Sequence, residues 1–125
     1  MLTIRREQML ALETRMAKRF RARVRVHLRR ELAKETEKVP DADLLRRIDE
    51  AILRGRKYGV TTERDVMLFV DLTFILSQNF EDAPDVRWAK KILLNKEMEG
   101  DAKMSLIYQQ LAARQTPPES HEVEI

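Results

Sequence analysis

Few residues of this chain have the types and spacing that catalysis requires. The 125 residues include no cysteine, which excludes thiol nucleophiles, cysteine zinc sites and disulfides. The two histidines lie far apart, His27 among arginines and His121 near the end, and no serine follows the strand–turn–helix pattern of a nucleophile elbow. A catalytic triad needs a nucleophile, a base and an orienting acid in mutual contact. We therefore predict no catalytic residues, no cofactor and no enzymatic activity.

Three acidic residues, Glu97, Glu99 and Asp101, come closest to a cluster of metal ligands. A structural metal site needs three or four ligands that converge on one point. Residues two apart on a helix point to different sides, so these acids do not share a face. We interpret them as a solvated helix end and predict no metal site.

Asp71 is the most informative polar residue, because it interrupts the most apolar segment of the chain, 66–76. An unpaired carboxylate in an apolar interior costs several kcal/mol. We predict an ion pair that ties two helices together, with Arg54, Arg56 or an arginine of the first helix as the partner. The alternative is that Asp71 faces a binding partner.

The elements that must position these residues are helices. Hydrophobic residues make up 43% of the chain and charged residues 36%, which suits a core with long solvated faces. Three glycines and four prolines are too few for the frequent turns of an all-β chain. We predict an all-α fold, a single-domain bundle of four to five helices over 1–115 around a buried central helix. A flexible acidic tail is expected at 116–125.

The first predicted helix is long and basic and spans about 3–35, with Thr3 as its N-cap, because no proline or glycine interrupts it. Apolar residues recur at about every fourth position from Met9 to Leu32 and form a stripe that winds slowly around the helix. One interpretation is that this stripe packs on the core. The other is that it projects as a surface for a partner's groove, with arginines beside it. The predicted partner-binding residues are Met9, Leu12, Met16, Arg19, Phe20, Arg23 and Val24.

Charge is distributed unevenly within the net charge of +3. Residues 5–30 contain ten basic and two acidic residues, a net charge of +8, whereas 81–125 contain six basic and nine acidic residues, a net charge of −3. The basic helix can contact the acidic part of its own chain, a protein partner or nucleic acid. Nucleic acid is the least favoured of the three, because Phe20 is the only aromatic residue of this helix that bases could stack on.

A second helix is predicted over 41–57, with Asp41 or Asp43 as its N-cap and Gly59 in a left-handed position after its end. Its apolar face consists of Leu44, Leu45, Ile48, Ala51 and Ile52.

The central helix is predicted from 63 to about 76, within the segment 63–79 around which the bundle is organised, because Thr62 is a good N-cap, Asp65 takes the place of a capping-box acid, and the segment is apolar on nearly every side. A loop that contains Phe80 is expected at 77–84. The residues with predicted structural roles are Tyr58, Gly59, Thr62, Arg64, Asp65, Asp71 and Trp88.

Two more helices complete the prediction. Asp85 is expected to cap the fourth helix, and a break near Gly100 separates it from the fifth. The apolar residues of the fourth are Val86, Ala89, Ile92 and Leu93, and those of the fifth are Ala102, Leu106, Ile107, Leu111 and Ala112.

The segment Tyr58–Val66, read as YGVTTERDV, and the following FVDL at 69–72 resemble the centre of a family of small helical proteins. Genes for these proteins lie beside the effector, adaptor and spike genes of bacterial type VI secretion systems. The resemblance covers residues 4 to about 94 and contains no catalytic motif. It implies an accessory protein that helps to load a toxic effector onto the secretion spike. The other positions that carry it are Ile4–Met9, Phe74, Phe80, Trp88–Ala89 and Ile92–Leu93.

We therefore predict a non-enzymatic adaptor or co-chaperone that binds an effector toxin, a larger chaperone or a spike protein. The alternatives are an immunity protein that neutralises a toxin and a nucleic-acid-associated protein; a homo-oligomer is compatible with either binding role. We expect a cytoplasmic protein without membrane contact. The first twelve residues lack the apolar core of a signal peptide, and the longest apolar stretch is far shorter than the about 20 residues that span a bilayer.

Overall fold

The structure, a computed structural model, describes residues 6–115 of the chain, and the side chains of 15–114. The described part is all-α, with six α-helices, two short 3-10 helices and no strand, so the predicted fold class is confirmed with more helices than the four to five expected. Thr3 and the tail at 116–125 lie outside it. The elements are α1 (Arg6–Glu31), α2 (Ala33–Thr36), α3 (Asp41–Lys57), α4 (Glu63–Ile75), η1 (Phe80–Asp82), η2 (Pro84–Val86), α5 (Arg87–Leu93) and α6 (Gly100–Gln115).

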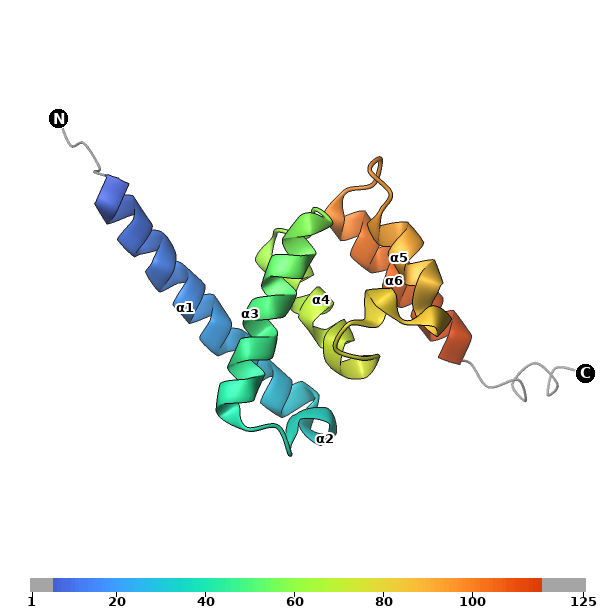
Figure 1. Cartoon of the computed structure of the whole chain (residues 1–125), viewed down its shortest axis with the longest axis horizontal. Helices are drawn as coiled ribbons and strands as arrows, with labels where there is room; N and C mark the ends of the chain where they lie inside the picture. The colour runs from blue at the N-terminus through green and yellow to red at the C-terminus, as the bar shows by residue number, and fades with distance from the viewer. Residues whose placement is uncertain (1–5, 116–125) are drawn as a thin grey trace, which may run out of the picture.

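The first helix ends earlier than predicted, because Leu32 leaves helical geometry with φ −120° and ψ 50°. The Thr36 hydroxyl donates to the carbonyl of Leu32 at 2.9 Å, and the Arg29 guanidinium donates to the carbonyls of Thr36 and, at 2.7 Å, Val39. These bonds fold the segment back as the separate turn α2, and α3 then runs back across α1 (Figure 1). The prediction of one helix to residue 35 was wrong for this last turn.

The second predicted helix is confirmed over its full length as α3, but its N-cap was predicted wrongly. Pro40 precedes the helix in an extended conformation and no side chain caps it, while Asp41 is the first helical residue. Instead of capping, the Asp41 carboxylate accepts from Arg25 at 2.9 Å and from Arg29 at 2.8 Å. Acids in a first helical turn are favourable without a capping bond, because of the helix dipole.

The turn between α3 and α4 follows the prediction closely. Gly59 has φ +80°, the left-handed conformation that favours glycine. The Thr62 hydroxyl accepts from the backbone N–H of Asp65 at 3.2 Å, as an N-cap does. The Asp65 carboxylate accepts from that same hydroxyl at 2.8 Å, so its partner is the Thr62 side chain.

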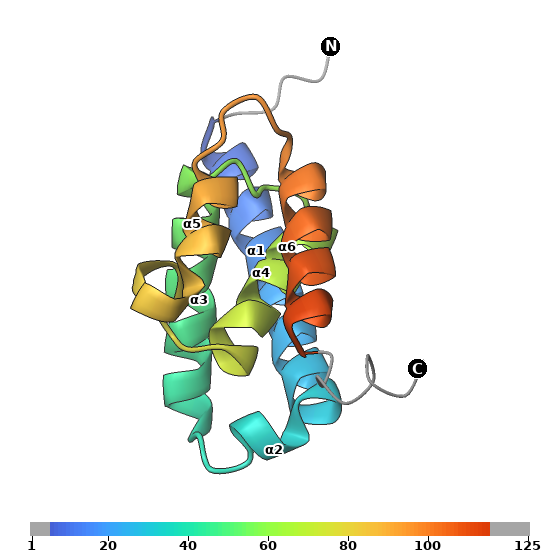
Figure 2. The ribbon, with the colours of Figure 1, turned by 90° about the vertical axis from the view of Figure 1, so that its right-hand side faces the viewer.

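The α4 helix is the buried centre of the fold, and it ends at Ile75, one residue before the predicted end. It contacts α1, α2, α3 and α6, and Figure 2 shows it between α1 and α6. Its side chains Phe69, Val70 and Leu72 are completely buried. Because other helices pack against α4 on several sides, its sequence is apolar on nearly every side.

The C-terminal helices differ from the prediction in two details. Two 3-10 turns precede α5, which starts at Arg87 without a side-chain cap, so Asp85 does not cap it. The buried face of α6 carries Lys103, Met104, Ile107 and Leu111, while Ala102 and Ala112 are exposed. The Lys103 ammonium donates to the carbonyls of Tyr58 and Leu93, each at 2.7 Å, and this contact holds position 103 inward.

None of the helices in the described part combines the length and the apolar character needed to cross a membrane.

Candidate partner-binding surface

The N-terminal half of α1 projects beyond the other helices (Figure 1). Every described side chain from Arg15 to Arg19 is exposed, and Phe20 is the first described residue of α1 that the core buries. The cause lies in the length of the helix, because 26 residues extend about 39 Å, more than α3 and α4 can cover.

The predicted partner-binding residues divide into three groups. Met16 (58% exposed), Arg19 and Arg23 are accessible, as a binding surface requires. Phe20 and Val24 are 8% and 0% exposed and belong to the core, which corrects their assignment as anchors, because a partner could reach them only by opening the fold. Met9 and Leu12 lie outside the described side chains.

A groove opens where α1 diverges from α3. We define the divergence groove as two hollows of about 190 and 330 Å³ that share Ala17, Ile52 and Arg56. Met16 lines the first hollow, and Leu53 lines the second. Leu53 is 59% exposed, so each hollow presents one large apolar side chain to solvent.

Most of the arginines along the middle of α1 bind acids of the chain itself. Arg21 pairs with Asp49 at 2.9 Å, Arg23 pairs with Glu63, and Arg25 and Arg29 both bind Asp41. The basic helix therefore contacts acids of its own chain, as one of the sequence interpretations held, but these acids come from α3 and α4 and not from 81–125. Exposed ion pairs of this kind contribute little stability each.

The cations at the projecting end differ from those arginines. Arg15, Lys18, Arg19 and Arg56 are exposed, and none of them pairs with an acidic side chain in the described part of the chain. Lys18 and Arg56 line the divergence groove itself. The groove thus combines exposed apolar side chains with positive charge that the fold leaves uncompensated.

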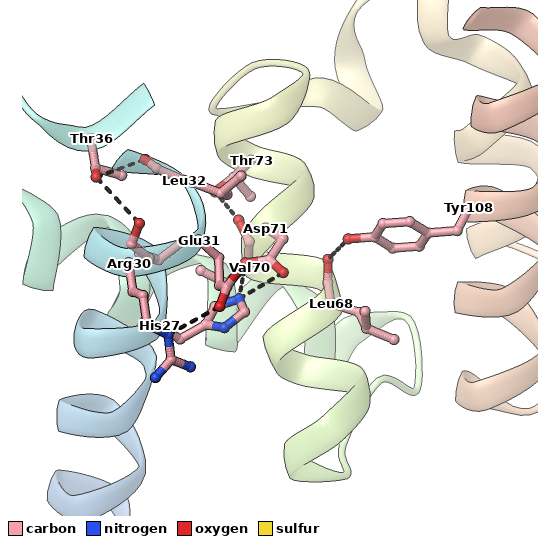
Figure 3. A network of polar contacts seen from close by, with 11 residues as sticks. His27, Arg30, Glu31, Leu32, Thr36, Leu68, Val70, Asp71, Thr73 and Tyr108 are labelled. Atoms are coloured by element: carbon pink, nitrogen blue, oxygen red, sulfur yellow. Dashed lines mark hydrogen bonds and ion pairs between the residues drawn. The ribbon is translucent and has the colours of Figure 1, made fainter. Parts of the chain in front are cut away.

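Asp71 forms the predicted link between two helices, but its partner is His27 of α1 and not an arginine. The Nε2 atom of His27 lies 2.9 Å from both carboxylate oxygens, and both side chains are partly buried (Figure 3). Burial raises the pKa of Asp71, and the hydrogen bond and charge of His27 oppose that rise. The negative charge of the nearby Glu31 adds to the rise.

The surroundings of this pair contain hydroxyls that are already engaged. Thr36 and Thr73 donate to backbone carbonyls, of Leu32 and Val70, and Tyr108 donates to the Leu68 carbonyl at 2.6 Å (Figure 3). Burial raises the pKa of Tyr108 far above its usual range, so this phenol stays protonated. The hydrogen bonds between His27 and Asp71 join α1 to α4, and we call this pair a clamp between the two helices.

The other residues with predicted structural roles contact α4 and α6 or lie within α4. Tyr58 packs against Phe69, with 6.4 Å between the ring centroids, and the Arg114 guanidinium lies 4.6 Å from the ring centroid of the half-buried Trp88. Asp65 is buried, whereas Arg64 is mostly exposed and reaches Asp65 only at 3.5 Å.

Sequence reasoning missed three features of the structure. Lys103, Ile107 and Leu111 follow one another at helical spacing, so this spacing indicates that Lys103 lies on the buried face. Leu53 follows Ile52 on α3 but does not belong to the apolar face of this helix. A leucine at such a position indicates an exposed apolar side chain that a partner can contact. The pair of Arg54 and the buried Glu81, with 2.9 Å between Nε and Oε2, joins segments far apart in sequence, and no local pattern predicts it.

In the described part of the chain, no group of three or more histidine, aspartate or glutamate side chains is arranged to hold a metal ion. No protein-family model, curated protein or solved structure matches the chain.

Proposed function

We propose that this protein is a non-enzymatic adaptor that binds another protein chain at the divergence groove and the projecting half of α1. One observation carries the proposal: Met16 and Leu53 are each more than half exposed in hollows that share the same three lining residues. Burying apolar surface is the dominant favourable term in most protein association.

A binding role without catalysis is supported by how the ionisable groups are used. The clamp of His27 and Asp71 connects two helices, and Lys103 and Glu81 are satisfied by carbonyls and by Arg54. Each of these groups has an evident structural role. Met16, Leu53, Lys18 and Arg56 are instead exposed, and they line the divergence groove.

The resemblance of the segments at 58–66 and 69–72 to proteins of type VI secretion loci supports a more specific role. In this role the protein is a cytoplasmic co-chaperone that holds an effector toxin, its larger chaperone or the spike protein before secretion. An adaptor of this kind needs an accessible surface and no reaction of its own.

Deletion of the gene in its native host tests this role. The adaptor proposal predicts that secretion of the cognate effector falls while the deletion strain survives contact with its siblings. Complementation with the unaltered gene should restore secretion, and complementation with a Met16→Glu and Leu53→Glu double variant should not. Self-killing of the deletion strain would instead identify an immunity protein, and unchanged secretion would contradict the adaptor role.

A further inference from the structure

Resting on the proposed function, we infer the chemistry of the partner: the divergence groove binds an acidic amphipathic helix. The juxtaposition of Met16 and Leu53 with Lys18 and Arg56 carries this inference. An amphipathic helix binds in a groove through apolar residues on one face and leaves its polar residues at the rim.

The geometry of the groove suits a helix. Helices α1 and α3 cross and then separate toward the N terminus of α1 (Figure 1), and Ala17 of α1 and Ile52 and Arg56 of α3 line both hollows. A third helix packed there would contact both α1 and α3. Its apolar residues at helical spacing would then cover Met16 in one hollow and Leu53 in the other.

The charges of the lining select an acidic partner. Lys18, Arg21 and Arg56 line the hollows together with two acids, Asp49 and Glu63. Both acids are already neutralised by pairing, Asp49 with Arg21 and Glu63 with Arg23 from outside the lining. Lys18 and Arg56 remain uncompensated among the described side chains, so acidic residues on the partner gain two ion pairs at the rim.

The same charges disfavour a second copy of this chain as the occupant. A symmetric dimer uses the same patch on both subunits. Such an interface at this groove would bring Lys18, Arg19 and Arg56 of one copy against the same cations of the other. Like charges placed opposite each other across an interface cost several kcal/mol, so an acidic partner fits better.

The test uses the full chain and two synthetic amphipathic peptides with identical leucine faces, one with glutamates on its polar face and one with lysines. Binding is followed by NMR from the methyl signals of Met16 and Leu53 and by calorimetry. We expect the glutamate peptide to bind with shifts at both methyl groups, and its affinity to fall as salt is raised. The lysine peptide should bind about tenfold more weakly or not at all.

A charge-reversal variant, Lys18→Glu with Arg56→Glu, makes the test specific. It should weaken binding of the glutamate peptide by about tenfold and strengthen binding of the lysine peptide. Leu94→Glu is the matched control, because Leu94 is 57% exposed at the end of α5 and lies outside the groove. Circular dichroism checks that each variant remains folded.

Three results would overturn the inference. They are equal binding of the two peptides, shifts that fall outside the groove, and a dimer of the chain whose interface is lost on changing Met16 and Leu53. The proposed function is judged separately by the deletion experiment. If the secretion defect occurs and the glutamate peptide fails to bind, the acidic chemistry is wrong and the adaptor role stands.

Discussion

The ammonium of Lys103 joins segments of the chain that lie far apart in sequence. It is buried in α6 and donates to the carbonyl of Tyr58 at the end of α3 and to that of Leu93 at the end of α5. The last carbonyls of a helix lack intrahelical partners and carry partial negative charge, so a cation is well placed there.

Replacing Lys103 by Met keeps the length of the side chain and removes the donor. We expect the free energy of unfolding to fall by about 2 kcal/mol, because the buried carbonyl contact to Leu93 and the partly buried one to Tyr58 are both lost. Urea denaturation measures this value. Lys91→Met, at an exposed position of α5, should change it by less than about 0.5 kcal/mol. Equal effects of the two substitutions would contradict the role given to Lys103.

The carboxylate of Asp71 makes stability depend on pH in a defined direction. Burial raises its pKa above the ordinary value of 3.8, with His27 opposing the rise. A carboxyl group with a raised pKa in the folded state binds its proton more tightly there. Its contribution to stability is therefore present below about pH 4 and is lost as the pH rises through the folded-state pKa.

Asp71→Asn removes this titration with little change of shape. We expect the free energy of unfolding of the parent chain, relative to the variant, to decrease as the pH rises from below 3.8 through the raised folded-state pKa of Asp71. Urea denaturation of both proteins across this range gives the difference. An increase with pH would mean that pairing with His27 outweighs burial and that the pKa is lowered.

The single residues that could be predicted from sequence are those with local causes. Gly59 and Thr62 were placed correctly, because a left-handed turn and an N-cap depend on a few neighbouring residues. The partner of Asp71 and the role of Lys103 depend on which helices meet in space. The arginines near His27 made an arginine the expected partner, whereas the fold turns Arg25 and Arg29 toward Asp41.

At the scale of the helices, the start of α6 packs closely against the turn after α3, and Gly100 lies at this contact. A β-carbon at Gly100 would lie 2.6 Å from the carbonyl oxygen of Gly59 and 3.3 Å from the Cα atom of Val60. Backbone atoms cannot move aside to relieve such a clash, whereas the end of a flexible side chain can. The packing of α6 therefore depends on the absence of a side chain at this position.

Gly100→Ala tests this contact, because intrinsic helix propensity and packing predict opposite signs. Alanine usually stabilises a helix relative to glycine by about 1 kcal/mol. Here we expect a loss of about 1–3 kcal/mol from the steric clash. Ser105→Ala, at an exposed position of α6, serves as the control and should stabilise slightly. A thermal melt in which Gly100→Ala is the more stable protein would contradict the contact.

The helices themselves were predicted well where one local signal was strong, as the apolar periodicity was for α3 and the Thr62 cap was for α4. The break at Leu32 could not be predicted, because neither proline nor glycine marks it. It arises from the bonds that Arg29 and Thr36 make to backbone carbonyls. The register of α6 was misjudged at Ala102 and Ala112, because small apolar residues fit exposed and buried positions alike.

For the molecule as a whole, the ion pairs of α1 bear on the nucleic-acid alternative. Arg21, Arg23 and Arg25 each bind an acid from α3 or α4, so contacts to phosphates would have to break these pairs. We expect no measurable binding of duplex DNA at about 0.15 M salt. Fluorescence anisotropy tests this, and binding that falls steeply with salt and is lost in Arg21→Ala would contradict it.

The division of α1 into a half that the core covers and a half that projects could be predicted only in part from the sequence. The apolar stripe continues from Met16 to Leu32 without a change of pattern, although Phe20 marks where burial begins. The apolar pattern of α1 does not indicate how long the neighbouring helices are. The length of those helices decides how much of α1 the core covers. Leu53 completes the exposed surface from a different helix.

Quantitative affinity purification from the native host tests the binding role most directly. The parent chain, a Met16→Glu and Leu53→Glu variant, and the Leu94→Glu control are expressed at equal levels from the chromosome. We predict that the parent and the control retain the same effector, chaperone or spike protein in near-stoichiometric amount, and that the double variant loses it. Retention by all three proteins, or the absence of a stoichiometric partner from the parent, would contradict binding at this groove.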